Sequence, residues 1–125
     1  MITIDYKSRV PIYDQIVSGF IRLKALGIIK AGDKIPSVRA LALDLGINPN
    51  TVQKAYTILE NDGIIYSVSG KGSFIAENNF AETALLALSE ADFISAVEKA
   101  KSVGVSASRL KEIIDSLFEG GNSRD

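Results

Sequence analysis

The chain has 125 residues, a formal net charge of −1, and neither cysteine nor histidine. That length accommodates one small domain with a short appendage. The missing side chains exclude disulfides, thiolate and imidazole metal ligands, and catalytic triads built on histidine. No nucleophile stands beside a base and no aspartate-rich metal loop is present, so we expect neither an enzyme nor a cofactor or bound metal.

The charge is unevenly distributed. Residues 1–76 contain nine Lys/Arg and six Asp/Glu, a net of +3, whereas residues 77–125 contain five and nine, a net of −4. A basic amino-terminal part is consistent with DNA contact confined to that part. No apolar stretch reaches the length of a membrane span and no secretory signal is present, so we expect a soluble, cytoplasmic protein with no membrane partner.

The first predicted elements are a short strand and a helix. Residues 2–5 alternate as a strand does, and a helix is predicted over residues 11–26, ended by Gly27. Two neighbouring apolar rows follow this helix: Ile12, Ile16, Phe20 and Leu23, and beside them Tyr13, Val17 and Ile21. Either the whole helix lies deep in the core, or one row meets the carboxy-terminal part or a partner subunit.

Two short helices are predicted next. Ser37 can cap the first, which stops at Gly46, a residue suited to the left-handed position after a helix. Asn48 can cap the second, with Pro49 at its first position and its end near residue 61. Two helices joined by a tight glycine turn predict a helix-turn-helix, with an ordinary helical hairpin in a core as the alternative.

The second of these helices has one apolar and one polar face. Its apolar positions, spaced i, i+3, i+4 and i+7, are Val52, Ala55, Tyr56 and Leu59. The other side carries Asn50, Thr51, Gln53, Lys54 and Thr57. Because amides and hydroxyls pair with base edges in the major groove of DNA, we expect Asn50, Thr51 and Gln53 to contact bases or adjacent phosphates. We expect Lys54 to contact a phosphate.

A β-hairpin is predicted after this helix. Residues 64–68 are β-branched and aromatic, and residues 73–76 can run back as a second strand. The turn between them contains Gly70, Lys71 and Gly72. A helix-turn-helix followed by a hairpin is a winged helix, so Lys71 should approach the phosphate backbone or the minor groove. The two glycines should let the backbone come close to DNA.

Several motifs stand in a fixed order between residues 11 and 75: PIYDQI at 11–16, GDKIPSVR at 32–39, NPNTV at 48–52 and GKGSF at 70–74. This order resembles the DNA-binding domain of the GntR family of bacterial transcription factors. The NPNTV form and the short tail are similar to the YtrA-type branch of that family.

The resemblance implies a transcriptional repressor that controls a neighbouring operon, such as that of an ABC transporter. It implies a DNA-contacting arginine at the position of Arg39. We also assign Ser37 and Asn48, at the starts of the two helices, to the DNA interface. Other branches have arginines at the positions of Pro49 and Gln53, so their operator sequences do not carry over to this chain.

Residues 77–125 are predicted to be helical. Residues 80–103 form either one helix or two, because a capping-box-like pattern begins at Ser89. Ser106 can cap a last helix that Gly120 and Gly121 should end, with residues 122–125 frayed. The apolar positions assigned to dimerisation are Phe80, Leu85, Leu86, Phe93, Val97, Leu110, Ile113, Ile114, Leu117 and Phe118.

A region this short is marginal as an independent domain. Burial of each large apolar side chain is worth about 1.5–3 kcal/mol, so these side chains need a covering surface. We expect a second copy to supply it, with packing inside one chain as the alternative. An effector, if one binds, would sit at the dimer interface.

The sequence thus predicts an α+β, mainly α fold: a winged helix-turn-helix over residues 1–76 and a helical dimerisation or effector region over residues 77–125. The predicted function is a homodimeric, sequence-specific regulator of a pseudo-palindromic double-stranded DNA operator. The alternative is a winged-helix module for protein–protein contact that has no operator.

Overall fold

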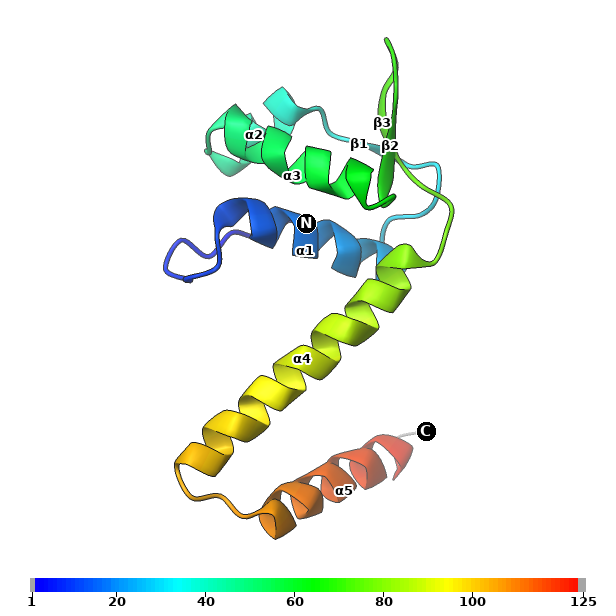
Figure 1. Cartoon of the computed structure of the whole chain (residues 1–125). Helices are drawn as coiled ribbons and strands as arrows, with labels where there is room; N and C mark the ends of the chain where they lie inside the picture. The colour runs from blue at the N-terminus through cyan, green and yellow to red at the C-terminus, as the bar shows by residue number, and fades with distance from the viewer. Residues whose placement is uncertain (1, 124–125) are drawn as a thin grey trace. The chain divides into compact units, whose positions relative to one another are not determined.

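The computed structural model describes residues 2–123, and the side chains of residues 2–120. In chain order its elements are α1 (Ile12–Ala25), β1 (Lys34–Ile35), α2 (Val38–Leu45), α3 (Pro49–Asn61), β2 (Ile65–Val68), β3 (Gly72–Ile75), α4 (Phe80–Ser102) and α5 (Ala107–Ser123) (Figure 1). The chain forms two compact units, one ending at Leu86 and the other beginning at Ala87. This mainly helical α+β fold confirms the predicted fold class.

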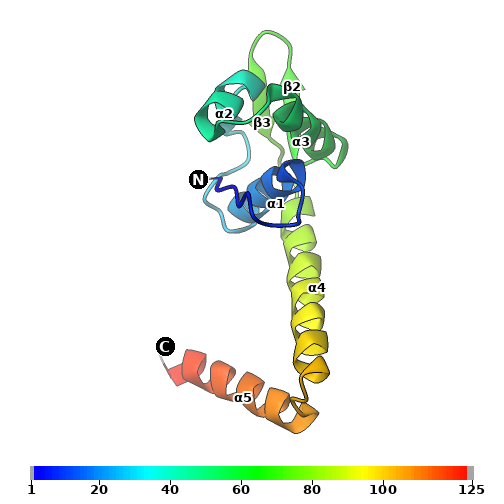
Figure 2. The ribbon, with the colours of Figure 1, turned by 90° about the vertical axis from the view of Figure 1, so that its left-hand side faces the viewer.

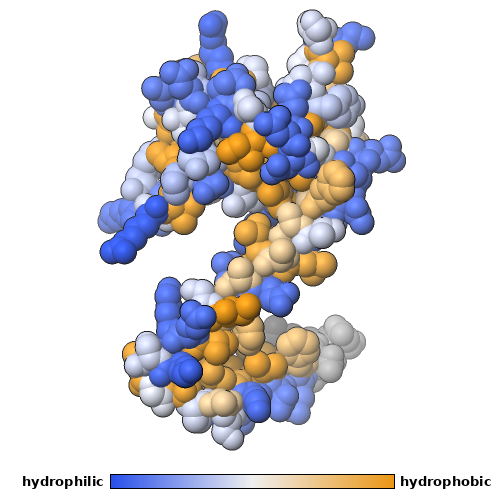
Figure 3. Space-filling view, in the orientation of Figure 1, coloured by the Kyte–Doolittle hydropathy of each residue, from blue (hydrophilic) through white to orange (hydrophobic). Residues whose placement is uncertain are grey.

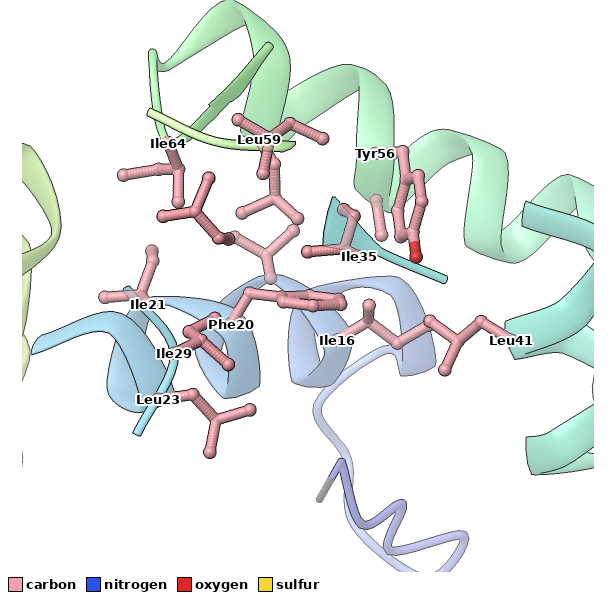
Figure 4. Packing of buried hydrophobic residues seen from close by; sticks show 14 of the residues in the cluster. Ile16, Phe20, Ile21, Leu23, Ile29, Ile35, Leu41, Tyr56, Leu59 and Ile64 are labelled. Atoms are coloured by element: carbon pink, nitrogen blue, oxygen red, sulfur yellow. The ribbon is translucent and has the colours of Figure 1, made fainter. Parts of the chain in front are cut away.

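The core of the first unit lies where α3 packs against α1, α2 and the sheet. The largest fully buried side chains are Ile16, Val52, Leu59 and Ile75. Phe20 of α1 meets Tyr56 of α3 edge to face, with ring centroids 5.8 Å apart and planes at 81° (Figure 4). The predicted apolar stripe of α3 is therefore its buried face.

The two helices of the helix-turn-helix begin at the predicted caps. Ser37 Oγ accepts from the backbone N–H of Ala40 at 3.1 Å, and Asn48 Oδ1 accepts from that of Asn50 at 2.8 Å. Gly46 has φ of 67°, the left-handed conformation that ends a helix without strain in glycine. Local signals alone thus define both ends of the turn.

The sheet contains a strand, β1, that the sequence did not predict. Its order is β1-β3-β2, with both pairs antiparallel. The β2–β3 turn projects beyond the helices (Figures 1 and 2). Strand β1 has only two residues, which pair with Phe74 and Ser73 of β3. A segment this short has no periodicity, so its pairing with β3 defines it as a strand.

The predicted strand at residues 2–5 is absent, and that prediction was wrong. Gln15 supplies the hydrogen bonds that a neighbouring strand would otherwise provide. Its Oε1 accepts from the backbone N–H of Asp5 at 2.8 Å, and its Nε2 donates to the carbonyls of Asp5 and Val10 at 3.0 and 2.9 Å. The segment therefore packs along α1 without forming a sheet.

Both apolar rows of α1 are buried inside the first unit at Ile16, Phe20, Leu23, Val17 and Ile21. This agrees with the deep-core alternative for the central part of α1.

The first turns of α4 pack within the first unit. Asn78 Oδ1 caps the helix by accepting from the N–H of Phe80 at 3.0 Å, while its Nδ2 donates to the carbonyl of Gly63 at 2.9 Å. Lys24 pairs with Glu82 at 2.7 Å, and the hydrogen bond from Lys24 holds the pKa of Glu82 below its ordinary value. These contacts explain why the compact unit extends to Leu86, past the composition boundary at residue 76.

Helix α4 is continuous over 23 residues, so the pattern at Ser89 does not begin a second helix. Ser106 caps α5 as predicted, because its Oγ accepts from the N–H of Arg109 at 3.1 Å. The predicted end of α5 at Gly120 and Gly121 was wrong, since the helix continues to Ser123. Gly120 does not adopt the positive φ that would end it. Residues 124–125, also expected to be frayed, lie outside the described residues.

Among the described residues, no helix combines the length and hydropathy that a membrane crossing requires.

Candidate nucleic-acid interface

The exposed face of α3 is polar and carries no carboxylate between residues 50 and 57. Asn50, Gln53, Lys54 and Thr57 are exposed, whereas Thr51 is half-buried. Four of the five predicted polar positions thus point to solvent, and Thr51 offers less of its hydroxyl surface. Side chains of this kind can donate to and accept from base edges.

The amides of this face retain unused hydrogen-bonding capacity. Gln53 Nε2 donates to Thr57 Oγ1 at 3.3 Å, which leaves its carbonyl oxygen and a second N–H available. The side-chain amide of Asn50 forms no hydrogen bond within the described part of the chain. Asn48 uses its oxygen for the helix cap, and its NH2 group has no partner among the described residues and can donate.

Lys54 contacts an aromatic ring of α1. Its Nζ lies 3.9 Å from the centroid of the Tyr13 ring, a cation–π contact. Such contacts at exposed positions are worth about 0.5–1 kcal/mol, so the ammonium can exchange this ring for a stronger anionic partner. No sequence pattern indicates this contact, because residues 13 and 54 are brought together only by the packing of α1 on α3.

Tyr56 links α3 to the beginning of α2. Its hydroxyl donates to the carbonyl of Pro36 at 2.6 Å, directly before the cap residue Ser37. Burial raises the pKa of this phenol above its ordinary value, so the group stays protonated and keeps donating. The buried face of α3 therefore helps to fix the orientation of its exposed face.

Arg39 projects from the first turn of α2 and is exposed. It lines a hollow of about 440 Å³ between α2 and the start of α3, together with Ala42, Leu43, Gly46, Ile47 and Pro49. Apart from Arg39, the residues that line the hollow are apolar. Ser37, two residues earlier, is also exposed, although its oxygen is used for the cap.

The β2–β3 turn carries the three predicted residues at its tip. Gly70 and Gly72 have φ of 74° and 115°, conformations that favour glycine, and Lys71 between them is exposed. An added Cβ would meet open space at Gly70. At Gly72 it would meet the side chain of Lys34, a residue that the sequence analysis did not select.

The cations of this surface have no acidic partners. Within the described part of the chain, the ion pairs are Lys24–Glu82 and Arg109–Glu112, and neither involves α2, α3 or the strands. Lys34, Arg39, Lys54 and Lys71 therefore offer uncompensated positive charge on the winged helix. The same described residues include no cluster of three potential metal ligands.

The predicted dimerisation residues fall into two groups. Leu85 packs partly against the core of the first unit, and the ring of Phe80 lies beside Gly63. In the second unit, α4 and α5 enclose an apolar cleft of about 160 Å³, lined by Phe93, Ala96, Val97, Leu110, Ile113, Ile114 and Leu117. Leu117 and Phe118 remain 69% and 72% exposed, and Figure 3 shows hydrophobic residues at the surface of this unit.

Helices α1, α2 and α3, followed by the β2–β3 hairpin, define a winged helix-turn-helix domain. In domains of this class, the second helix of the helix-turn-helix, here α3, enters the major groove of DNA. A family model described as bacterial regulatory proteins, gntR family, matches residues 13–75. The chain belongs to this family, and it is a YtrA-type, DNA-binding transcriptional regulator, not an enzyme.

Relatives over the whole length support this assignment. The chain is 40% identical to the HTH-type transcriptional repressor YtrA of Bacillus subtilis (strain 168) over 132 aligned residues, covering 100% of each. A transcriptional regulator from Oenococcus oeni has a similar structure, with a TM-score of 0.75, 32% identity, and coverage of 94% of this chain and 99% of that one.

A structure containing DNA is also similar to this chain. It is the DNA-binding domain of AraR in complex with operator ORX1, with a TM-score of 0.53 and 30% identity. The similarity covers 59% of this chain and 92% of AraR's domain.

Proposed function

We propose that the chain is a homodimeric repressor that binds a pseudo-palindromic operator, with one winged helix in each half-site. The observation that carries this proposal is the exposed, carboxylate-free polar face of α3. Within the described residues, the cations of α2, α3 and the strands have no acidic partners. The repressor role is supported by similarity to the transcriptional repressor YtrA of Bacillus subtilis.

Base recognition falls to Asn50 and Gln53. Both are exposed on α3, and each has an amide that can face adenine with one donor and one acceptor. A well-formed bidentate pair discriminates between bases by about 1–3 kcal/mol. Thr51 contributes less, because it is half-buried.

Phosphate contacts orient the domain on the duplex. Arg39 and Lys71 supply them from α2 and the wing tip, and Ser37 and Asn48 add hydrogen bonds at the helix starts. Gly70, where an added Cβ would meet open space, lets the backbone of the turn approach DNA, and Gly72 helps to form that turn. Lys54 binds phosphate after its ammonium leaves the ring of Tyr13.

The second unit supplies dimerisation. It contains fewer than forty residues in two helices, too few to form an independent core. Large apolar side chains on both helices stay exposed, among them Leu86 at the unit boundary and Phe93, Ile94, Leu117 and Phe118. Since burial of each is worth about 1.5–3 kcal/mol, a second copy covering them gains a substantial free energy.

The proposed target is a neighbouring operon, such as that of an ABC transporter, and the proposed location is the cytoplasm. Both rest on the family. If an effector binds, its proposed site is at the dimer interface, where the apolar cleft between α4 and α5 is lined by proposed dimer contacts.

Selection of bound sequences from random duplex DNA tests the proposal. We expect an enriched site with two inverted half-sites, whose centres lie about 10 bp or a multiple apart. Binding to it should weaken steeply with salt, because phosphate contacts release counterions. If no sequence is enriched and binding does not depend on salt, the protein–protein module becomes the better account.

A further inference from the structure

The outer face of the three-stranded sheet carries one charged side chain. Residues paired across antiparallel strands share a face, so Lys34, Phe74 and Tyr66 lie in a row on one side. The opposite side carries the buried Ile35, Ile65 and Ile75. Apart from the phenol of Tyr66, Lys34 is the only titratable side chain in the three strands.

Lys34 leans toward the wing turn. An ideal Cβ placed on Gly72 would lie 2.9 Å from Cε of Lys34 and 3.6 Å from its Nζ. The stem of the lysine therefore covers the bare backbone of Gly72, and its ammonium sits at the end of the turn that holds Lys71. Within the described residues this ammonium has neither a hydrogen bond nor an ion pair.

Two features indicate that this position serves a ligand. The aliphatic stem of Lys34 packs against Gly72, while the residue as a whole stays exposed, so its ammonium is not buried. The strands contain no carboxylate to neutralise it, so the wing concentrates two positive charges around Gly72. A concentration of uncompensated charge on a projecting hairpin suits a polyanion.

We propose that Lys34 is a further DNA-binding residue, which contacts a backbone phosphate beside the one bound by Lys71. Gly72 then has two roles: its positive φ forms the turn, and its missing Cβ leaves space for the lysine stem. This inference rests on the proposed function, since it adds a contact to the same operator complex.

The test is the salt dependence of affinity for the duplex selected by the wild-type protein, measured by fluorescence anisotropy. Lys34→Met keeps the stem over Gly72 and removes the charge, whereas Lys34→Arg keeps the charge. Lys30→Met is the matched control. It removes a charge from the loop at the opposite end of the hairpin, where the N–H of Gly32 donates to the carbonyl of Ile75 at 2.8 Å.

We expect Lys34→Met to lower the salt slope by about one ion. Each phosphate contact contributes about −0.9 to the slope of log affinity against log salt concentration. The loss of affinity of Lys34→Met relative to the wild type should therefore shrink about 3.5-fold between about 50 and 200 mM salt. Lys34→Arg and Lys30→Met should keep the wild-type slope.

An unchanged slope in Lys34→Met, or an equal loss in Lys30→Met, would overturn the assignment while leaving the proposed function intact. If the wild-type protein shows no salt-dependent binding to any selected duplex, both fail together. Equal melting temperatures of the variants would establish that folding is unaffected, and Lys34→Gln offers a second neutral variant.

Discussion

Replacement of Leu117 by alanine should weaken the proposed dimer strongly. The residue is 69% exposed on α5, so most of its surface can become buried when a second copy packs against it. Full burial of a leucine is worth about 1.5–3 kcal/mol, and covering the exposed part is therefore worth about 1–2 kcal/mol. A two-fold interface contains this residue twice, which gives a loss of about 2–4 kcal/mol per dimer.

That loss corresponds to a roughly 30- to 700-fold increase in the dimer dissociation constant. Sedimentation equilibrium over a dilution series, without DNA, measures it. Leu43→Ala is the matched control, because Leu43 is 84% exposed on α2, outside the proposed interface. If Leu117→Ala dimerises as tightly as Leu43→Ala, the apolar surface of α5 does not hold the two copies together.

Three further variants test the first unit. Gln53→Ala should flatten the preference at one base position in each half-site; an unchanged selected sequence at unchanged affinity would rule out base reading by Gln53. Lys71→Ala should shorten or weaken the footprint at the outer edge of each half-site, and an identical footprint would remove the wing from the mechanism. Tyr56→Phe leaves the carbonyl of Pro36 without its 2.6 Å donor, so urea unfolding should show a loss of about 1–3 kcal/mol. Unchanged stability would mean that this bond is not needed to hold α3 against α2.

Much of the helical architecture could be predicted because its signals are local. In each helix cap, at Ser37, Asn48 and Ser106, the side-chain oxygen accepts a hydrogen bond from a backbone N–H only two or three residues further along the chain. The apolar stripe of α3 likewise follows from spacing along one helix.

Features that depend on distant partners were missed. Strand β1 exists through its pairing with β3, and Gln15 replaces a strand partner for Asp5. Gly120 was predicted to end α5 because glycine often adopts a positive φ at the end of a helix, but its φ is not positive in the structure.

The same division applies to the candidate site. The exposed positions of α3 and the wing tip were identified from the sequence, whereas the contacts of Lys54 with Tyr13 and of Lys34 with Gly72 were not. Each joins residues more than thirty positions apart in the chain. Sequence patterns therefore indicate which side chains are exposed, and the packed structure determines which residues their charged groups contact.

The central claim is that two copies of the chain bind one operator, one in each half-site. The mass of the complex tests it most directly. Sedimentation equilibrium of the full chain with a labelled duplex carrying the complete selected site should give two chains per duplex. The protein alone should be a dimer at micromolar concentration. A single chain per duplex, or a monomer with and without DNA, would contradict the account.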